Sequence, residues 1–208
     1  MILIAITGSQ LFAHAVLLIL VGMLLSAVVF IPLSAFRYFL MGSKDNQSLK
    51  FGFHSIVMIY VTALIGYTFF PIPKITPYWC SRRPAHRVVL DPTLPFRSIR
   101  QQVMQGENWL QILFSHSATG LWLNVLLFVP MGFILVWHYR LSIRAALALG
   151  FISSLFIEVA QFSANFGLVE CQYRISDIND LLMNTLGAFL GAFLAQSIRA
   201  LVKGGDGR

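Results

Sequence analysis

Long hydrophobic stretches, each free or nearly free of Lys, Arg, Asp and Glu, alternate along the chain with shorter polar segments. The stretches are continuously apolar instead of alternating with a period of two, which excludes a transmembrane β-barrel. A membrane-spanning helix needs about 20 mostly apolar residues. The pattern therefore predicts an all-α integral membrane protein, a bundle of about five transmembrane helices at residues 11–36, 52–73, 120–139, 145–164 and 178–198.

Two polar loops between these spans are predicted to share one side of the membrane. Residues 74–106 form a long extracytoplasmic loop rich in Pro and Arg, between the second and third spans, and residues 165–177 form a shorter loop two spans later. Cys80 and Cys171, the two cysteines of the chain, fall in these loops. An oxidising compartment would favour a disulfide between them, and two unrelated thiols are the alternative.

Composition supports a membrane protein. Hydrophobic residues make up 57% of the chain and charged residues 11%, whereas soluble domains are about a quarter charged. The net charge of +7 comes from basic residues in the loops, which are expected to contact anionic lipid headgroups. Because no basic stripe is interleaved with exposed aromatic residues, nucleic acid is not an expected partner.

Basic residues in the short connectors favour an extracytoplasmic N-terminus and a cytoplasmic C-terminus, although the Arg-rich long loop argues the other way. The predicted organisation has three parts. Residues 1–50 form an N-terminal transmembrane helix with a short basic cytoplasmic connector, 51–202 the main membrane domain, and 203–208 a disordered tail.

Polar residues inside the spans are the candidates for function, because ionisable groups in a bilayer are tolerated when they pair, line a cavity or do chemistry. Glu158, in the middle of a span, is followed by Gln161 and Asn165 at spacings that place all three on one helical face. The spacing of Arg174, Asp177, Asp180 and Asn184 predicts a second stripe. Together the two stripes and one more asparagine predict a polar intramembrane cleft: Asn124, Glu158, Gln161, Arg174, Asp177, Asp180 and Asn184.

Each of these residues also has a purely structural explanation. Glu158 could be the ion-pair partner of Arg174, and Asp177 could cap the start of a helix. The two asparagines inside the spans could join helices by hydrogen bonds. The Gly187-Ala-Phe-Leu-Gly191 motif indicates a close-packing face.

Three segments share the order and spacing of motifs in a known family. They are Asn124-Val-Leu-Leu-Phe-Val-Pro130-Met-Gly132, Ile157-Glu158-Val-Ala-Gln161 and Arg174-Ile-Ser-Asp177-Ile-Asn-Asp180-Leu-Leu-Met-Asn184-Thr-Leu-Gly187. Through them the chain resembles the VanZ-like family. A weaker similarity runs from Tyr67-Thr-Phe-Phe-Pro71 to Leu94-Pro95-Phe96-Arg97-Ser98. Two positions depart from the family pattern: Asn179 stands where a third acid is frequent, and Thr93 where an Asn is common.

The resemblance implies a small multi-pass protein of the bacterial cell (inner) membrane. The namesake of the family gives low-level resistance to teicoplanin, a lipid-tailed glycopeptide antibiotic, and other members appear with envelope polysaccharide functions. The family has no settled reaction, so the resemblance implies a cell-envelope setting without a mechanism.

Two hypotheses follow. In the first, the protein binds a lipid-linked envelope precursor or a lipid-tailed glycopeptide, with membrane lipids as its other partners. In the second, it is a membrane-embedded enzyme in which Glu158, Asp177 and Asp180 act as acids and bases on a lipid-linked (pyro)phosphate or glycan. The residues predicted to bind the substrate in either case are Asn124, Gln161, Arg174, Asn184, Arg97 and Arg100.

No cofactor is expected, although a divalent cation between Asp177 and Asp180 is an alternative. A transporter is a third hypothesis, weakened by the absence of an internal repeat.

Overall fold

The structure is a computed structural model that describes residues 28, 47–69, 72, 74–82 and 87–205. Most of the first predicted span and of the region 1–50, as well as residues 206–208 of the predicted tail, lie outside the described residues. The chain divides into two compact units after Pro71. The helices and strands are, in order, α2 (Gln47–Phe69), α3 (Pro77–Ser81), β1 (Val88–Val89), α4 (Leu94–Met104), α5 (Trp109–Leu113), α6 (His116–Trp137), α7 (Ile143–Phe162), β2 (Ser176–Asp177) and α8 (Ile178–Gly205).

The described residues are mostly helical, and three helices are long and apolar enough to cross a membrane: α6, α7 and residues Ile178–Val202 of α8. They correspond to the third, fourth and fifth predicted spans. The second predicted span is α2, whose apolar part, Phe53–Phe69, is shorter than a typical span. The protein is therefore a helical membrane protein with three candidate spans among its described residues.

Helices α6, α7 and α8 pack together in the second unit through small residues. A side chain at Gly187 or Gly191 would collide with the backbone of α6 at Val125 or Val129. A side chain at Gly132 of α6 or Gly150 of α7 would collide with Ala188 of α8. The close-packing role predicted for the Gly187–Gly191 motif is confirmed, because only residues without a side chain allow the backbones to approach this closely.

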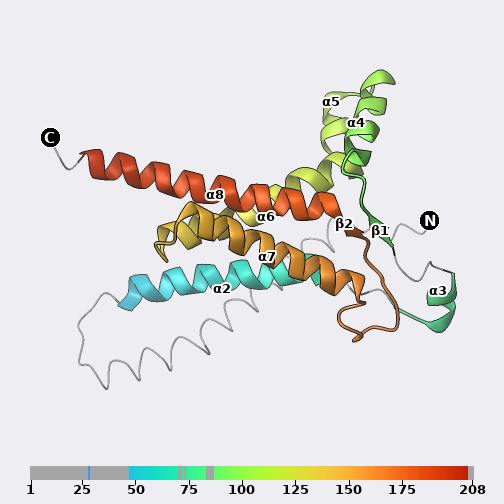
Figure 1. Cartoon of the computed structure of the whole chain (residues 1–208), viewed down its shortest axis with the longest axis horizontal. Helices are drawn as coiled ribbons and strands as arrows, with labels where there is room; N and C mark the ends of the chain where they lie inside the picture. Colours follow the sequence, from blue (N-terminus) through green and yellow to red (C-terminus); the bar gives the residue numbers. More distant parts are fainter. Residues whose placement is uncertain (1–27, 29–46, 70–71, 73, 83–86, 206–208) are drawn as a thin grey trace. The chain divides into compact units, whose positions relative to one another are not determined.

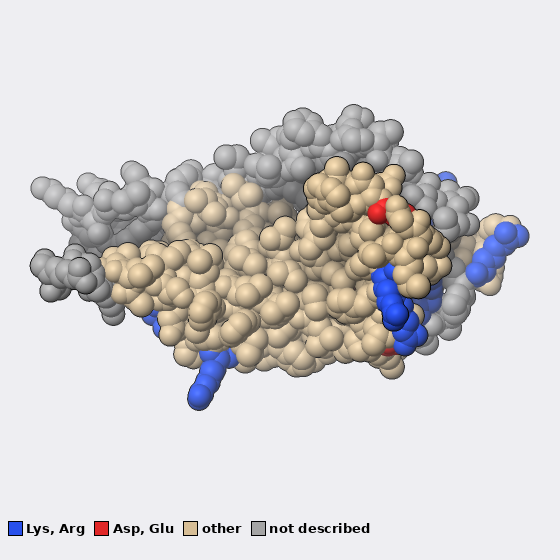
Figure 2. All heavy atoms as spheres, turned by 90° about the horizontal axis from the view of Figure 1, so that it is seen from above, with Lys and Arg blue, Asp and Glu red and all other residues tan. Residues whose placement is uncertain are grey.

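The large apolar side chains of these helices mostly point away from the small-residue interface, as expected for a bundle surrounded by lipid. At the end where α6 leads into α7 the charges are basic: Arg140, Arg144 and Arg199, whose guanidinium donates to the carbonyl oxygen of Val136 at 3.0 Å. Figure 2 shows one face on which the charged side chains lie towards the two ends, with uncharged surface between them.

The opposite end of the bundle, where α6 and α8 begin and α7 ends, is called the loop end here (Figure 1). The predicted long loop, residues 74–106, leads to it and is partly regular, because it contains α3, β1 and α4. The strand β1 pairs in parallel with β2, Val88 opposite Ser176 and Val89 opposite Asp177.

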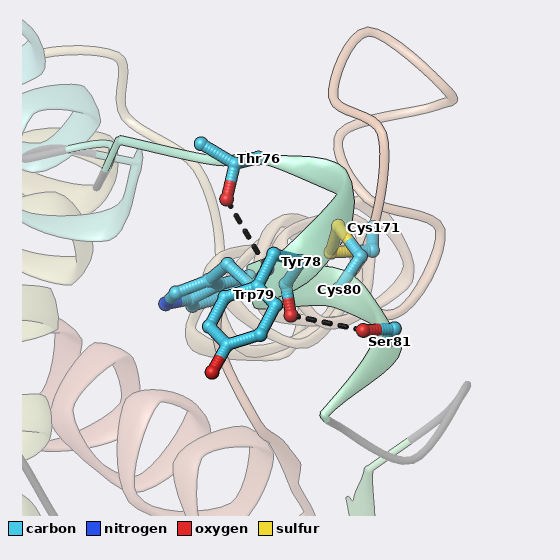
Figure 3. Close-up of a disulfide and its surroundings, with 6 residues drawn as sticks. All are labelled: Thr76, Tyr78, Trp79, Cys80, Ser81 and Cys171. Carbon is cyan, nitrogen blue, oxygen red and sulfur yellow. Dashed lines mark hydrogen bonds between the residues drawn. A yellow bond between two sulfur atoms is a disulfide. The ribbon is translucent and has the colours of Figure 1, made fainter.

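A disulfide between Cys80 and Cys171 joins the long loop to the 165–177 loop (Figure 3). Cys80 lies in the short helix α3, which Thr76 caps by accepting a hydrogen bond from the backbone N–H of Trp79 at 3.2 Å. The disulfide and the β1–β2 pairing confirm that the two loops lie on the same side of the bundle.

Candidate functional site

Polar side chains from α6, α7, β2 and α8 meet at the loop end of the bundle. We call this group the polar cluster. Its members are contributed by three helices and by the segment that leads into α8: Asn124, Ser154, Glu158, Arg174, Ser176, Asp177, Asn179, Asp180 and Asn184. All except Ser154, Ser176 and Asn179 belong to the site predicted from the sequence.

Glu158 connects α7 to β2. Its Oε2 atom accepts hydrogen bonds from the hydroxyl of Ser176 at 2.8 Å and from the backbone N–H of Asp177 at 2.9 Å. The side chain is 6% exposed. Glu158 lies about one turn before the end of α7, which is Phe162. It is therefore nearer to the loop end than the mid-span position predicted from the sequence. The carboxyl group is therefore buried at the loop end of the bundle.

Asp180 lies in the first turn of α8 and accepts a hydrogen bond from the amide of Asn124 on α6. The N-terminus of a helix carries a partial positive charge, which stabilises a carboxylate in the first turn. Three other charged side chains, Glu158, Asp177 and Arg174, lie close enough to act electrostatically on Asp180. Three acids and one arginine thus share a small volume at the loop end.

Two asparagines complete the hydrogen bonding of the cluster. The amide of Asn184 donates to the hydroxyl of Ser154 at 3.0 Å and joins α8 to α7 one turn deeper in the bundle. Asn179 donates to Oδ1 of Asp177 from its backbone N–H at 2.8 Å and from its side-chain amide at 2.9 Å. An acid at position 179 could not make the second of these bonds, so Asn179 holds Asp177 in a way that an acid there could not.

The second predicted stripe is only partly helical. Asp180 and Asn184 share a face of α8, but Arg174 and Asp177 precede the helix, since the chain is extended at Ser176 and Asp177 to pair with β1. A helical periodicity therefore does not apply before Ile178. Arg174 nevertheless lies close enough to Asp180 to act on it electrostatically, although the predicted helical stripe is wrong.

The first predicted stripe ends early. Gln161 is buried on the face of α7 that carries Glu158. Asn165 was expected on the same face, but α7 ends at Phe162 and Asn165 lies in a left-handed turn. The amide of Asn165 instead donates to the hydroxyl of Tyr173 at 3.0 Å.

This turn has positive φ angles at four successive residues, Ala164 to Gly167. For residues other than glycine, the left-handed conformation costs about 1–2 kcal/mol each. Backbone hydrogen bonds hold the turn, among them Gly167 N–H to the Ser163 carbonyl at 2.9 Å. The turn reverses the chain after α7 and directs it towards Cys171 and the long loop.

The two loops also meet at Arg87. The side-chain amide of Gln172 accepts from the backbone N–H of Arg87 at 2.6 Å and donates to its carbonyl at 2.9 Å, while the Ser176 N–H donates to the same carbonyl at 3.1 Å. These bonds fix the backbone at Ser176 and Asp177, the two residues that bind Glu158. The geometry of the polar cluster therefore depends on both loops.

Arg97 and Arg100 lie on the exposed side of α4. Arg97 forms an ion pair with Asp91 at 3.0 Å. Hydrogen bonds from the side chain and backbone of Thr93, together with the charge of Arg97, hold the pKa of Asp91 below its usual range. No hydrogen bond or ion pair among the described residues joins these two arginines to the polar cluster, so their role in binding a substrate stays a prediction.

No group of three or more His, Cys, Asp or Glu with metal-binding geometry occurs in the part of the chain that the structure describes. The divalent cation between Asp177 and Asp180 stays a prediction.

Three oxygen atoms of the cluster are buried and have no hydrogen-bond donor: Oε1 of Glu158, Oδ1 of Asn179 and Oδ1 of Asn184. In Asn179 the amide nitrogen faces the carboxylate of Asp177, which fixes the oxygen on the other side. A buried polar atom without a partner costs about 1–3 kcal/mol. All three atoms are acceptors, and no buried side-chain nitrogen among the described residues of the cluster lacks a partner in the same way.

The profile of the VanZ/LLP1 family matches residues 53–199. The chain belongs to the VanZ/LLP1 family. The resemblance to the VanZ-like family is thereby confirmed, and the matched range contains every member of the polar cluster. No curated protein and no solved structure gives a significant match.

In this VanZ/LLP1 protein, three members of the cluster were not predicted from the sequence: Ser154, Ser176 and Asn179. Ser154 precedes Glu158 by four residues on one face of α7, so helical spacing alone could have identified it. Ser176 and Asn179 lie next to Asp177 in extended and helix-start backbone, where spacing gives no such signal.

Proposed function

We propose that this VanZ/LLP1 protein of the bacterial cell membrane binds a lipid-linked envelope component or a lipid-tailed glycopeptide at the polar cluster, and that it lowers susceptibility to teicoplanin. Binding removes the antibiotic from its target or changes the surface on which its lipid tail anchors. The family membership and the three apolar helices support a membrane setting for this activity.

The observation that carries the proposal is the set of three buried acceptor oxygens that have no donor. The buried oxygens of Glu158, Asn179 and Asn184 have no hydrogen-bond donor, which costs folding free energy. A ligand that donates hydrogen bonds to them would remove this cost and gain binding free energy. Hydroxyl, amide and ammonium groups are donors of this kind, and glycans and glycopeptides are rich in them. A phosphodiester or pyrophosphodiester group has no hydrogen-bond donor, and it would instead pair with a cation such as Arg174, which acts electrostatically on Asp180.

The place of the cluster also suits an amphiphilic ligand. Glu158 and Asp180 lie at the ends of their spans, where a polar headgroup can reach them while its lipid tail remains between acyl chains. We expect the N-terminus outside and the C-terminus in the cytoplasm, which places the loop end on the extracytoplasmic side.

The test is the susceptibility of a sensitive Gram-positive host to teicoplanin and to vancomycin, which lacks the lipid tail. Hosts carry the wild type, Glu158→Gln, Asp177→Asn or the control Glu170→Gln at equal membrane expression. Glu170 is an exposed acid in the 165–177 loop, so its variant makes the same chemical change outside the cluster. We expect the wild type and Glu170→Gln to raise tolerance to teicoplanin alone, and both cluster variants to lose it.

Tolerance that persists in Glu158→Gln and Asp177→Asn contradicts a role for the cluster. A wild type without effect on teicoplanin contradicts this function and leaves the family membership unchanged.

The alternative function is that of a membrane-embedded enzyme acting on a lipid-linked (pyro)phosphate or glycan. One oxygen of Glu158 is fixed by two hydrogen bonds while the other has no partner, an arrangement that orients a general acid or base. Mass spectrometry of the envelope lipids distinguishes the two functions. An enzyme changes the lipid-linked precursors, and Glu158→Gln abolishes the change, whereas a binder leaves their composition unaltered.

A further inference from the structure

Helix α4 has one face against the bundle and another that no described residue covers. The Ser98 hydroxyl on α4 and the Ser117 hydroxyl on α6 are hydrogen-bonded at 2.9 Å, which fixes α4 to the loop end. On the far side, Phe96 is 53% exposed and Val103 is 59% exposed. These two residues are seven positions apart and therefore lie on one stripe of the helix.

The two arginines of α4 lie along one side of this stripe. Arg97 and Arg100 are three positions apart, and both are exposed. The short helix α5 continues the apolar surface, with Trp109 69% exposed. An apolar stripe bordered by arginines, with an exposed tryptophan nearby, is the composition of a helix that lies in the membrane interface.

The orientation of α4 fits this composition. Figure 1 shows α4 and α5 projecting sideways from the bundle, across the direction of α6 and α8, at the end where both of these helices begin. The candidate spans define the membrane normal, so a helix that crosses their direction at one end of the bundle runs along the membrane surface. α5 is held in place by the indole N–H of Trp122, which donates to the carbonyl of Leu113 at 3.0 Å.

Charge supports a lipid surface as the occupant. The segment 74–110 contains six basic residues and two acidic ones, Asp91 and Glu107, which gives it a net charge of 6 − 2 = +4. Anionic headgroups attract basic segments of this kind by about 1 kcal/mol for each Lys or Arg near the surface. An uncharged protein partner would gain nothing from these arginines.

We propose that α4 lies flat in the interface of the bilayer, with Phe96 and Val103 among the acyl chains and Arg97 and Arg100 at the lipid phosphates. The helix thereby holds the loop end against the membrane surface. This inference does not depend on the proposed function, since it concerns the bulk lipid and not a ligand of the polar cluster.

Nitroxide labels on α4 test the proposal in the full chain, reconstituted into nanodiscs of phosphatidylcholine and phosphatidylglycerol. The label is placed on Phe96→Cys or Val103→Cys, on the stripe, and on Gln101→Cys, an exposed position on the polar side. The native cysteines form a disulfide, so without reductant the label reacts with the added cysteine alone. Molecular oxygen concentrates in the bilayer, so a high rate of collision between the nitroxide and oxygen indicates a lipid environment. A high rate of collision with a water-soluble nickel chelate indicates exposure to water.

We expect the labels at 96 and 103 to collide more with oxygen than with the nickel chelate, and the label at 101 to show the reverse. High nickel accessibility at all three positions overturns the proposal, because α4 would then lie in water. Low accessibility to both reagents at 96 and 103 also overturns it, because a protein surface and not lipid would cover the stripe. Two positions on the stripe guard against one variant that fails to fold.

Discussion

Ala188 of α8 faces a glycine of α6 and a glycine of α7, and it permits a sharp test of the packing. A Cβ atom added at Gly150 would collide with the Cβ of Ala188, whereas one added at Gly132 would collide with the backbone carbonyl of Ala188. Removing the methyl group of Ala188 therefore relieves the first collision and leaves the second.

The expected magnitudes follow from this geometry. Overpacking lowers the free energy of unfolding by about 1–3 kcal/mol. A glycine-to-alanine change in a helix raises it by roughly 0.5–1 kcal/mol, because alanine loses less backbone entropy on folding. Gly150→Ala should therefore lower the free energy of unfolding by up to about 2.5 kcal/mol. Gly132→Ala should cost more, because backbone atoms yield less readily than a side chain. As a control, Gly120→Ala should not destabilise, since nothing lies within 4 Å of the added atom.

The assay is reversible unfolding in mixed detergent micelles, followed by circular dichroism, for each alanine variant with and without Ala188→Gly. We expect a coupling free energy of about 1–3 kcal/mol between positions 150 and 188, and one below about 0.5 kcal/mol between positions 132 and 188. Equal coupling for both pairs, or none at 150, would refute the packing described for α7 and α8.

Three further predictions concern the loops and the cluster. In intact cells Cys80 and Cys171 should resist a membrane-impermeant maleimide until a reductant is added. Labelling before reduction contradicts the disulfide, and no labelling after reduction contradicts the predicted extracytoplasmic position of the loops. The pKa of Asp91 is lower in the folded protein than its ordinary value of 3.8. Its carboxylate therefore stabilises the start of α4 above pH 3.8, and this stability is lost as the pH falls through the lower pKa of the folded state. Amide protection in α4 should therefore decrease below pH 3.8 in the wild type, and Asp91→Asn should remove the dependence. Asn124→Leu leaves the Asp180 carboxylate without its donor and should cost about 1–3 kcal/mol in the micelle assay; a change below about 0.5 kcal/mol contradicts the hydrogen bond.

Hydrophobic runs were sufficient to predict α6, α7 and α8, because a membrane span is a local property of about 20 residues. The ends of these helices agree with the prediction within four residues, except that α8 continues to Gly205, beyond the predicted limit at residue 198 and into the predicted tail. α3 and α4 were not predicted, since both have a proline near their first residue and too few apolar residues for a helical pattern to be visible. The pairing of β1 with β2 joins two-residue segments far apart in the chain, and no local pattern encodes it.

The candidate site was predictable where helical spacing applies. Glu158, Asp180 and Asn184 were identified as acids and amides inside apolar runs, and the structure brings them to one end of the bundle. Spacing failed at Asn165, because three successive residues other than glycine adopt positive φ angles there, against their intrinsic preference. It also assigned Arg174 and Asp177 to a helix, although the chain is extended before Ile178.

The hydrogen bond between Asn124 and Asp180 has a consequence for the synthesis of the protein. The ribosome delivers α6 before α7, and both before α8, so Asn124 and Glu158 enter the bilayer while Asp180, Ser176 and the backbone that binds Glu158 are still to come. Unpaired polar groups in a bilayer are costly. A nascent chain that stops before β2 therefore lacks the partners of both side chains, and the addition of β2 and α8 is the step of biogenesis that supplies them.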